Sequence, residues 1–392
     1  MAIVTQPAAD QPVPDQPDPA GAGPAGPGVG EPVAVVGVDT HTDTHTAALL
    51  GRSGGVLAQL VVPADPHGAA QLLAWAIEHA PDGGPLWWAV EGTRSHGVGL
   101  TRLLQQAGHH VLEAPRPRRR HRRGRGKSDS LDALAAARAV IAALDSGHAD
   151  RLATPRTDGD RETLRQLLII RRHYTDLRTA TVNLFKSLIL TADDPLREHL
   201  RGRSTAKQIS ALIGPARGHT TPPTPPPATD REGQHRRTHL TELAHDIRTL
   251  DQRLRTNHTD LTTLIETTMP SLLTIYGVGP ITAATLLTTW SHHGRCRTEA
   301  AYAALAGTNP IPASSGRTNR HRLNRGGDRH LNAALHTIVM TRRRGHHQPT
   351  TDYIHRRRTH PTHPRTDPEI NRSLKRYLAR HLYRHMQTHT HP

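Results

Sequence analysis

Two apolar runs that each end on an acidic residue constrain the fold of this chain most. Residues 33–38 are apolar and lead into Asp39, and residues 86–90 are apolar and lead into Glu91. Short apolar runs without alternation are typical of strands that are buried on both faces of a sheet. We therefore expect both acids at the ends of buried strands, where their carboxylates can meet.

The elements around these runs follow a fixed order. We predict strands at residues 33–39, 46–50, 56–62, 86–91 and 110–114, and helices at 65–77, 98–106 and 129–144. The resulting order, three strands followed by alternating helices and strands, is that of the ribonuclease-H/RuvC superfold. The sequence thus predicts an α/β domain of this type over residues 32–150, preceded by a disordered tail at 1–31.

Two further acids begin the last helix of this domain. Asp129 and Asp132 are spaced i and i+3, so they share one helix face and can converge with Asp39 and Glu91. Carboxylates are the ligands of hard divalent ions, and a pair of Mg²⁺ ions stabilises the attacking and leaving oxygens of phosphoryl transfer. We predict all four as metal ligands and catalytic residues, with Asp43 as a weaker candidate. Taken singly, Asp129 and Asp132 also complement a helix dipole.

The charge balance favours nucleic acid as the partner. The chain carries a formal charge of +16, and all but four of its 50 basic residues are arginine. The guanidinium group of arginine is well suited to bidentate hydrogen bonding with phosphate. A basic run precedes the acidic helix; its alternative role is a solvated loop. The residues predicted to bind nucleic acid here are Arg118, Arg119, Arg120, Arg122, Arg123, Arg125 and Lys127.

No apolar run is long enough to span a membrane, and the N-terminus lacks the layout of a signal peptide. A single cysteine excludes a disulfide framework and a cysteine zinc site. We therefore predict a cytoplasmic, nucleoid-associated protein that does not contact membranes.

The middle of the chain has the spacing of coiled-coil helices. Apolar residues recur every three or four positions over 167–188 and again over 240–264. They predict a helical hairpin at 151–268, interrupted by a Pro-rich loop at 214–229, which pairs with itself or with another subunit. Asn257 in the second seam either fixes the register or is a tolerated mismatch.

The remaining residues, 269–392, are predicted to form a mostly helical domain with a basic, His-rich tail. Gly277 and Gly279 suggest a helix-hairpin-helix-like turn whose backbone N–H groups bind phosphate; a plain glycine-containing turn is the alternative. Ser314 and Ser315 precede Gly316 in an arginine-rich segment and are candidate nucleophiles, which need activation by a metal or a base. The nearby residues predicted to bind nucleic acid are Arg317, Arg320, Arg322, Arg325 and Arg329.

Several short motifs together resemble one family. They are the segments GVDTH at 37–41, AVEGT at 89–93, GKSDSLDA at 126–133, GVGP at 277–280, ASSGR at 313–317 and LNRGG at 323–327. In combination they resemble the DEDD-type insertion-sequence transposases, which include the Piv-type DNA invertases. Thr42 stands where the family often has lysine.

The resemblance implies a RuvC-like domain, a coiled-coil connector and a C-terminal domain with a catalytic serine. Ser315 is the preferred serine because Gly316 follows it. It also implies Mg²⁺, in two ions, a dimer or tetramer, and a structured guide RNA from the element that pairs with DNA.

These observations predict an enzyme that cuts and rejoins DNA as an RNA-guided recombinase. One alternative is a RuvC-like, structure-selective nuclease that uses water, with Ser315 structural. The other is a nucleic-acid-binding relic without catalysis.

Overall fold

A computed structural model describes residues 30–114, 129–215, 227–228, 230–313, 321–361 and 364–389, without the side chains of Asp82 and His321. Several predicted features lie outside the described residues: most of the tail, the basic run that contains Arg118–Lys127, much of the Pro-rich loop, Ser314, Ser315, Arg317 and Arg320. Contacts divide the chain into two units. One comprises Met1–Thr157 with Trp290–Leu305, and the other comprises Asp158–Thr289 with Ala306–Pro392.

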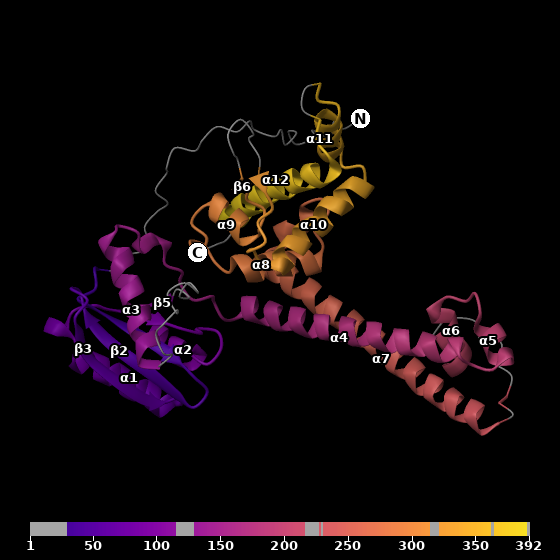
Figure 1. The fold of residues 1–392 in the computed structure, drawn as a ribbon, viewed down its shortest axis with the longest axis horizontal. Helices are drawn as coiled ribbons and strands as arrows, with labels where there is room; N and C mark the ends of the chain where they lie inside the picture. The colour runs from indigo at the N-terminus through magenta and orange to yellow at the C-terminus, as the bar shows by residue number, and fades with distance from the viewer. Residues whose placement is uncertain are drawn as a thin grey trace, which may run out of the picture. The chain divides into compact units, whose positions relative to one another are not determined.

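The first unit is built on a five-stranded mixed sheet in the order β3-β2-β1-β4-β5 (Figure 1). The first three strands are antiparallel neighbours, and β4 and β5 run parallel to β1. The bounds, which differ from the predicted ones by at most two residues, are β1 Ala34–Thr40, β2 Thr44–Gly51, β3 Val56–Pro63, β4 Leu86–Val90 and β5 His110–Glu113. This strand order is consistent with the ribonuclease-H-like arrangement expected from the sequence.

Helices cover both faces of this sheet, which is why β4 and the part of β1 before Asp39 are apolar. On one face, Val36 and Val38 pack with residues of α1 Pro66–Glu78 and α2 Val98–Gln106. On the other face, Val35 packs with residues of α3 Asp129–Asp145. Successive residues of a strand point to opposite faces, so one continuous apolar run supplies both cores.

One glycine lets α3 approach the centre of the sheet. A Cβ atom added at Gly37 would lie 2.0 Å from the backbone oxygen of Ala133 and 2.7 Å from the backbone nitrogen of Ala137. A side chain at this position of β1 is therefore excluded, and only small residues of α3 face it. The close contact brings the first turn of α3 beside the end of β1.

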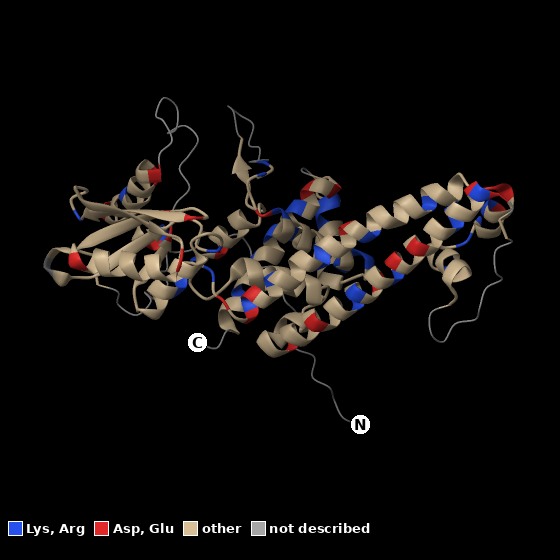
Figure 2. Cartoon of the chain, turned by 90° about the horizontal axis from the view of Figure 1, so that it is seen from below, with Lys and Arg blue, Asp and Glu red and all other residues tan. Residues whose placement is uncertain are grey.

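The second unit contains two long helices, α4 Asp160–Leu190 and α7 Arg231–Thr268, which lie side by side (Figure 1). Two shorter helices that the sequence analysis did not predict, α5 Asp194–Leu200 and α6 Thr205–Ile213, share a core with their ends. Figure 2 shows charged residues of both signs along the long helices. The predicted hairpin is thus helical, while its assignment as a coiled coil stays a prediction.

Asn257 is buried between the two long helices. Its Nδ2 donates to the backbone oxygen of Leu167 at 3.0 Å, and its Oδ1 accepts from Arg171 at 3.3 Å. Because the amide reaches groups at one level of α4, it favours one register of α4 against α7, in line with the first of the two predicted roles.

The predicted apolar seams are buried to different extents. Most of the α7 seam is buried or half-buried, whereas Ile170, Leu177 and Leu184 on α4 are 43%, 44% and 52% exposed. These three residues are spaced by seven, so they lie on one stripe of the helix. We call them the α4 stripe.

The C-terminal part is helical, as expected. It contains η4 Pro270–Thr274, α8 Pro280–Trp290, α9 Glu299–Leu305, α10 Arg329–Arg344, α11 Gln348–Arg358 and α12 Asp367–Thr388. Of these, α9 belongs to the first unit. No sequence signal indicated that residues 290–305 return to the N-terminal unit.

Candidate metal centre

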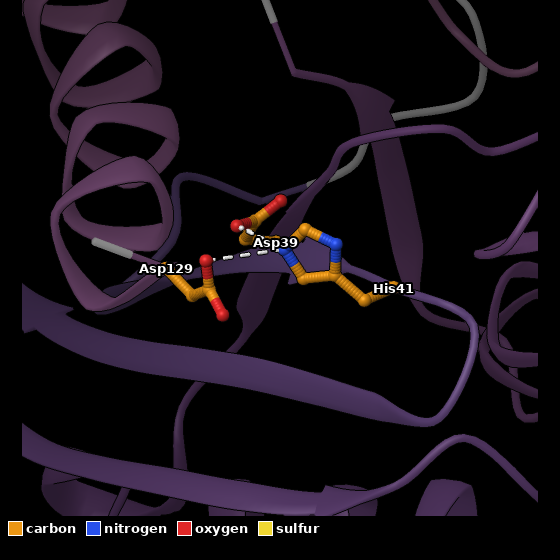
Figure 3. Close-up of side chains that lie close together, drawn as sticks. All are labelled: Asp39, His41 and Asp129. Atoms are coloured by element: carbon orange, nitrogen blue, oxygen red, sulfur yellow. Dashed lines mark hydrogen bonds and ion pairs between the residues drawn. The ribbon is translucent and has the colours of Figure 1, made fainter. Parts of the chain in front are cut away.

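The first acid lies at the end of β1. Asp39 is 4% exposed, and its Oδ2 lies 3.1 Å from Nε2 of His41. The same ring nitrogen lies 3.2 Å from Oδ1 of Asp129, the first residue of α3 (Figure 3). All three ligand atoms lie within 4.8 Å of one another. Within the described part of the chain, this is the one group of three or more His, Cys, Asp or Glu side chains with that spacing.

Glu91 is held by the backbone of the neighbouring strand. Its N–H donates to the backbone oxygen of Val38 at 2.9 Å, which continues the parallel pairing of β4 with β1. Thr40 Oγ1 donates to the backbone oxygen of Glu91 at 2.8 Å. Gly92 then turns the chain at φ +62°, and a Cβ there would lie 2.7 Å from Ser95 Oγ. These constraints fix Glu91 beside the end of β1.

A cavity of about 610 Å³ brings three of the four predicted acids together: Asp39, Glu91 and Asp132 line it. Asp129 does not line it. Its side chain is 49% exposed, and it joins the group through His41. Asp43 is exposed and lies apart from the cavity and from the His41 group.

The donor set fits a divalent metal ion. Carboxylate oxygens are ligands that Mg²⁺ prefers, and Asp39, Glu91 and Asp132 line one cavity at the ends of two adjacent strands and the first turn of α3. The imidazole of His41 adds a nitrogen donor, which suits Mn²⁺ and other transition metals better than Mg²⁺. The arrangement can therefore hold a cation beside a polar cavity that admits a substrate.

Two family models match the chain, and together they span both units. One, described as a DEDD transposase model of IS110, matches residues 36–192, which include all four acids. The other, described as Transposase IS116/IS110/IS902 family, matches residues 269–355, which include both candidate serines. The chain belongs to the IS110 family of DEDD transposases. No protein in a curated collection matches it.

Transposases of this family cleave and transfer DNA, so DNA is a partner of this IS110-family transposase. Over the described residues, no helix combines the length and apolar content needed to cross a lipid bilayer.

The cavity also contains residues that the sequence analysis missed. Glu113 ends β5, and its Oε2 accepts from Nη2 of Arg295 at 3.0 Å. Arg295 Nη1 donates to the backbone oxygen of Thr154 at 2.9 Å, and Arg156 lines the same cavity. Burial lowers the pKa of the Arg295 guanidinium, and the charge of Glu113 opposes that shift. These contacts join residues up to 182 positions apart, so no local sequence motif predicts them.

The predicted glycine turn of this transposase packs against its own helices. Gly277 has φ +87°, and a Cβ there would lie 3.2 Å from the backbone oxygen of Ile338 in α10. The N–H of Gly279 donates to Thr282 Oγ1 at 2.9 Å at the start of α8. The packing explains why glycine stands at 277, and phosphate binding at this turn stays a prediction.

The segment with the candidate serines is flanked by paired strands. β6 Ile311–Pro312 and β7 His321–Arg322 are antiparallel. At their base, Asn324 Nδ2 donates to Asn309 Oδ1 at 2.7 Å. Of the arginines predicted to bind nucleic acid here, those described are exposed: Arg322, Arg325 and Arg329.

Proposed function

We propose that this transposase cuts and rejoins DNA at a metal centre whose ligands are Asp39, Glu91 and Asp132. The observation that carries the proposal is the single cavity, lined by these three carboxylates, at the ends of β1 and β4 and the first turn of α3. Its position on a 3-2-1-4-5 sheet supports a RuvC-like, ribonuclease-H-type domain. Asp129, the fourth acid, is linked to this group by its contact with His41.

The centre is proposed to hold Mg²⁺, in two ions. When bound, the metal supplies positive charge that stabilises the charge developing at phosphorus. Asp39 is buried and fixed at the end of a central strand, so it is suited to hold one position rigidly. Asp132 lies on a helix that Gly37 admits to close contact, which sets its distance from Asp39.

Ser315 is proposed as the nucleophile, on the basis of the sequence. Its hydroxyl oxygen would form a bond to a DNA phosphorus while the bond from that phosphorus to a deoxyribose oxygen breaks. The serine proton leaves, and the released deoxyribose oxygen takes up a proton. A second DNA hydroxyl then attacks the phosphoserine, which restores Ser315 and joins the new strands. This exchange conserves the number of phosphodiester bonds.

A structured RNA encoded by the element is proposed to select the DNA sequences that are cut, by base pairing with them. The net charge of +16 and the arginine-rich composition support a large nucleic-acid interface. A protein whose sequence choice is delegated to base pairing reads backbone shape more than base edges. Arg118–Arg125 and the arginines from Arg317 to Arg329 are the proposed backbone contacts.

The active form is proposed to be a homo-oligomer, a dimer or tetramer. The α4 stripe supports this, since Ile170, Leu177 and Leu184 keep a seven-residue spacing on an exposed helix face. Burying such a stripe against another helix of the same kind forms a coiled-coil seam. The proposed oligomer would let the acids of one subunit act with the serine of another.

The test uses the purified full chain, the RNA that co-purifies with it, and a plasmid carrying both ends of the element. Ser315→Ala should abolish joined product and any covalent protein–DNA complex, yet retain Mg²⁺ binding measured by calorimetry. Asp132→Asn should abolish both product and metal binding. Ser146→Ala, an exposed serine after α3, serves as the matched control.

Recombination that survives Ser315→Ala would eliminate the serine step and leave the water-using nuclease. Product that is indifferent to Asp132→Asn would eliminate the metal centre. If sequencing finds no structured RNA from the element in repeated purifications, the guided mechanism is overturned.

A further inference from the structure

Arg156, in the acidic cavity, has no hydrogen-bond or ion-pair partner in the part of the chain that the structure describes. Arg156 lies between η3 Ala149–Arg151 and α4, and it lines the cavity with Asp39, Glu91 and Asp132. Its Nε is buried without a hydrogen-bond partner. Among the described residues, no ion pair or hydrogen bond reaches its guanidinium. This arrangement is costly for a partly buried cation unless an anion joins it.

The loop that carries Arg156 is fixed on both sides. Thr154 accepts from Arg295 through its backbone oxygen at 2.9 Å, and its Oγ1 lies 3.0 Å from His292 Nε2. On the other side, the N–H of Thr157 donates to Ser291 Oγ at 3.2 Å. Segment 290–305 thus holds the loop against the sheet, and the position of Arg156 is set before any ligand arrives.

Arg295, another arginine of the cavity, is already neutralised. Arg295 pairs with Glu113 at 3.0 Å, so its charge is balanced within the protein. Arg156 shares the cavity with carboxylates but lies in no ion pair with any of them. The cavity therefore combines a guanidinium that has no partner among the described residues with carboxylates that suit a divalent cation. A ligand that suits both groups would carry anionic oxygens, which can pair with the guanidinium and with a cation that the carboxylates would hold.

We propose that Arg156 binds the non-bridging oxygens of the nucleic-acid phosphodiester that enters the acidic cavity, and that the Glu113–Arg295 pair positions it. A guanidinium fork matches two phosphate oxygens, which a lysine ammonium cannot do. The inference rests on the proposed function, because it places the substrate of that same centre. Arg156 is a substrate-binding residue, and Arg295 is a positioning residue.

The test measures binding rather than turnover. The full chain carrying Ser315→Ala is titrated with the dinucleotide pdTpdT, with and without Mn²⁺, by calorimetry and by the Mn²⁺-induced broadening of the dinucleotide's phosphorus resonance. Arg156→Ala should weaken dinucleotide binding by about tenfold or more, the effect expected for loss of a charge-assisted hydrogen bond. Mn²⁺ affinity without dinucleotide should stay equal or increase, because a positive charge has left an acidic cavity.

Weaker dinucleotide binding without any loss of Mn²⁺ affinity indicates a phosphate-binding role, because a structural role would weaken the binding of both ligands. Arg156→Lys keeps the positive charge without the planar guanidinium and should weaken dinucleotide binding by a smaller factor. This variant decides the question if Arg156→Ala unfolds at a lower temperature than the parent. Arg52→Ala, whose partner Asp145 lies outside the cavity, should bind like the parent.

Dinucleotide affinity unchanged in both Arg156 variants would overturn the inference. If the parent binds no Mn²⁺, the proposed metal centre fails, and the titration without metal still judges Arg156 by the same criterion.

Discussion

The imidazole of His41 lies 3.2 Å from the carboxylate of Asp129. The contact ties the turn after β1 to the first residue of α3. The same ring nitrogen lies 3.1 Å from Asp39. A nitrogen donor therefore stands between two of the four acids, and its chemistry bears on which metal the centre accepts.

His41→Ala should change the metal preference. Imidazole contributes to Mn²⁺ binding and little to Mg²⁺ binding, so we expect Mn²⁺ affinity to fall about tenfold while Mg²⁺ affinity changes little. Calorimetric titration with each ion provides the measurement. His67→Ala, on an exposed position of α1, is the control. Equal losses for both ions would mean that His41 only orients the carboxylates.

Gly37→Ala should destabilise the first unit. The new Cβ would lie 2.0 Å from the backbone oxygen of Ala133, so α3 must move away at a cost of about 1–3 kcal/mol. Thermal unfolding should show a lower midpoint, and metal binding should weaken because Asp132 moves with α3.

Gly99→Ala is the matched control for this change. Gly99 lies in α2 with nothing within 4 Å of an added Cβ. Alanine there should raise stability, by about 0.5–1 kcal/mol. The close-contact explanation fails if both substitutions shift the midpoint in the same direction.

Asn257→Ala should destabilise the pair of long helices. It removes the hydrogen bond to Leu167 and leaves that backbone oxygen and the Arg171 guanidinium short of a partner. We expect a loss of about 1–3 kcal/mol in denaturant unfolding followed by helical circular dichroism. His258→Ala, the exposed neighbour, should have little effect. An equal change in both variants would show that Asn257 is a tolerated mismatch.

Leu177→Glu should lower the oligomeric state. It places a charge in the middle of the exposed α4 stripe, where it would be buried in the proposed seam. Light scattering after size exclusion should report a smaller mass at equal concentration, with unchanged helical content. Thr179→Glu changes an exposed polar residue of the same helix and should keep the parent mass. Parent mass in Leu177→Glu contradicts an interface on this stripe.

Acid should destabilise the first unit through one buried and two half-buried histidines. Burial lowers the pKa of His45, with a smaller contribution from the charges of His96 and His41, while the Thr44 backbone contact opposes the shift. Burial also lowers the pKa of His109 and His110. As the pH falls below 6.5, the pKa of histidine in the unfolded chain, the unfolded chain binds protons that the folded unit does not yet bind. Stability is therefore lost on acidification and is insensitive to these groups at higher pH.

His45→Gln should make the pH dependence of the unfolding midpoint shallower between pH 6.5 and the lower folded pKa. His67→Gln, exposed on α1, should leave that dependence unchanged. The same slope in His45→Gln as in the parent would show that His45 does not take part.

The sequence predicted the features that depend on local pattern. The strands predicted to end at Asp39 and Glu91 have observed bounds within two residues of the predicted ones, because a strand buried on both faces needs a continuous apolar run. Three of the four acids line one cavity, as their positions at strand ends and on one helix face suggested. The heptad spacing likewise predicted two helices that lie side by side.

Only the tertiary structure decided which of those features act together. It brought His41 between Asp39 and Asp129, left Asp129 outside the cavity, and left the three residues of the α4 stripe exposed. It also returned residues 290–305 to the first unit, so that Arg295 meets Glu113 and the loop of Arg156 is fixed. Such contacts join residues that are far apart in the sequence and that have no distinctive spacing along it. Local periodicity reports which face of an element is buried, but it does not report which distant segment covers that face.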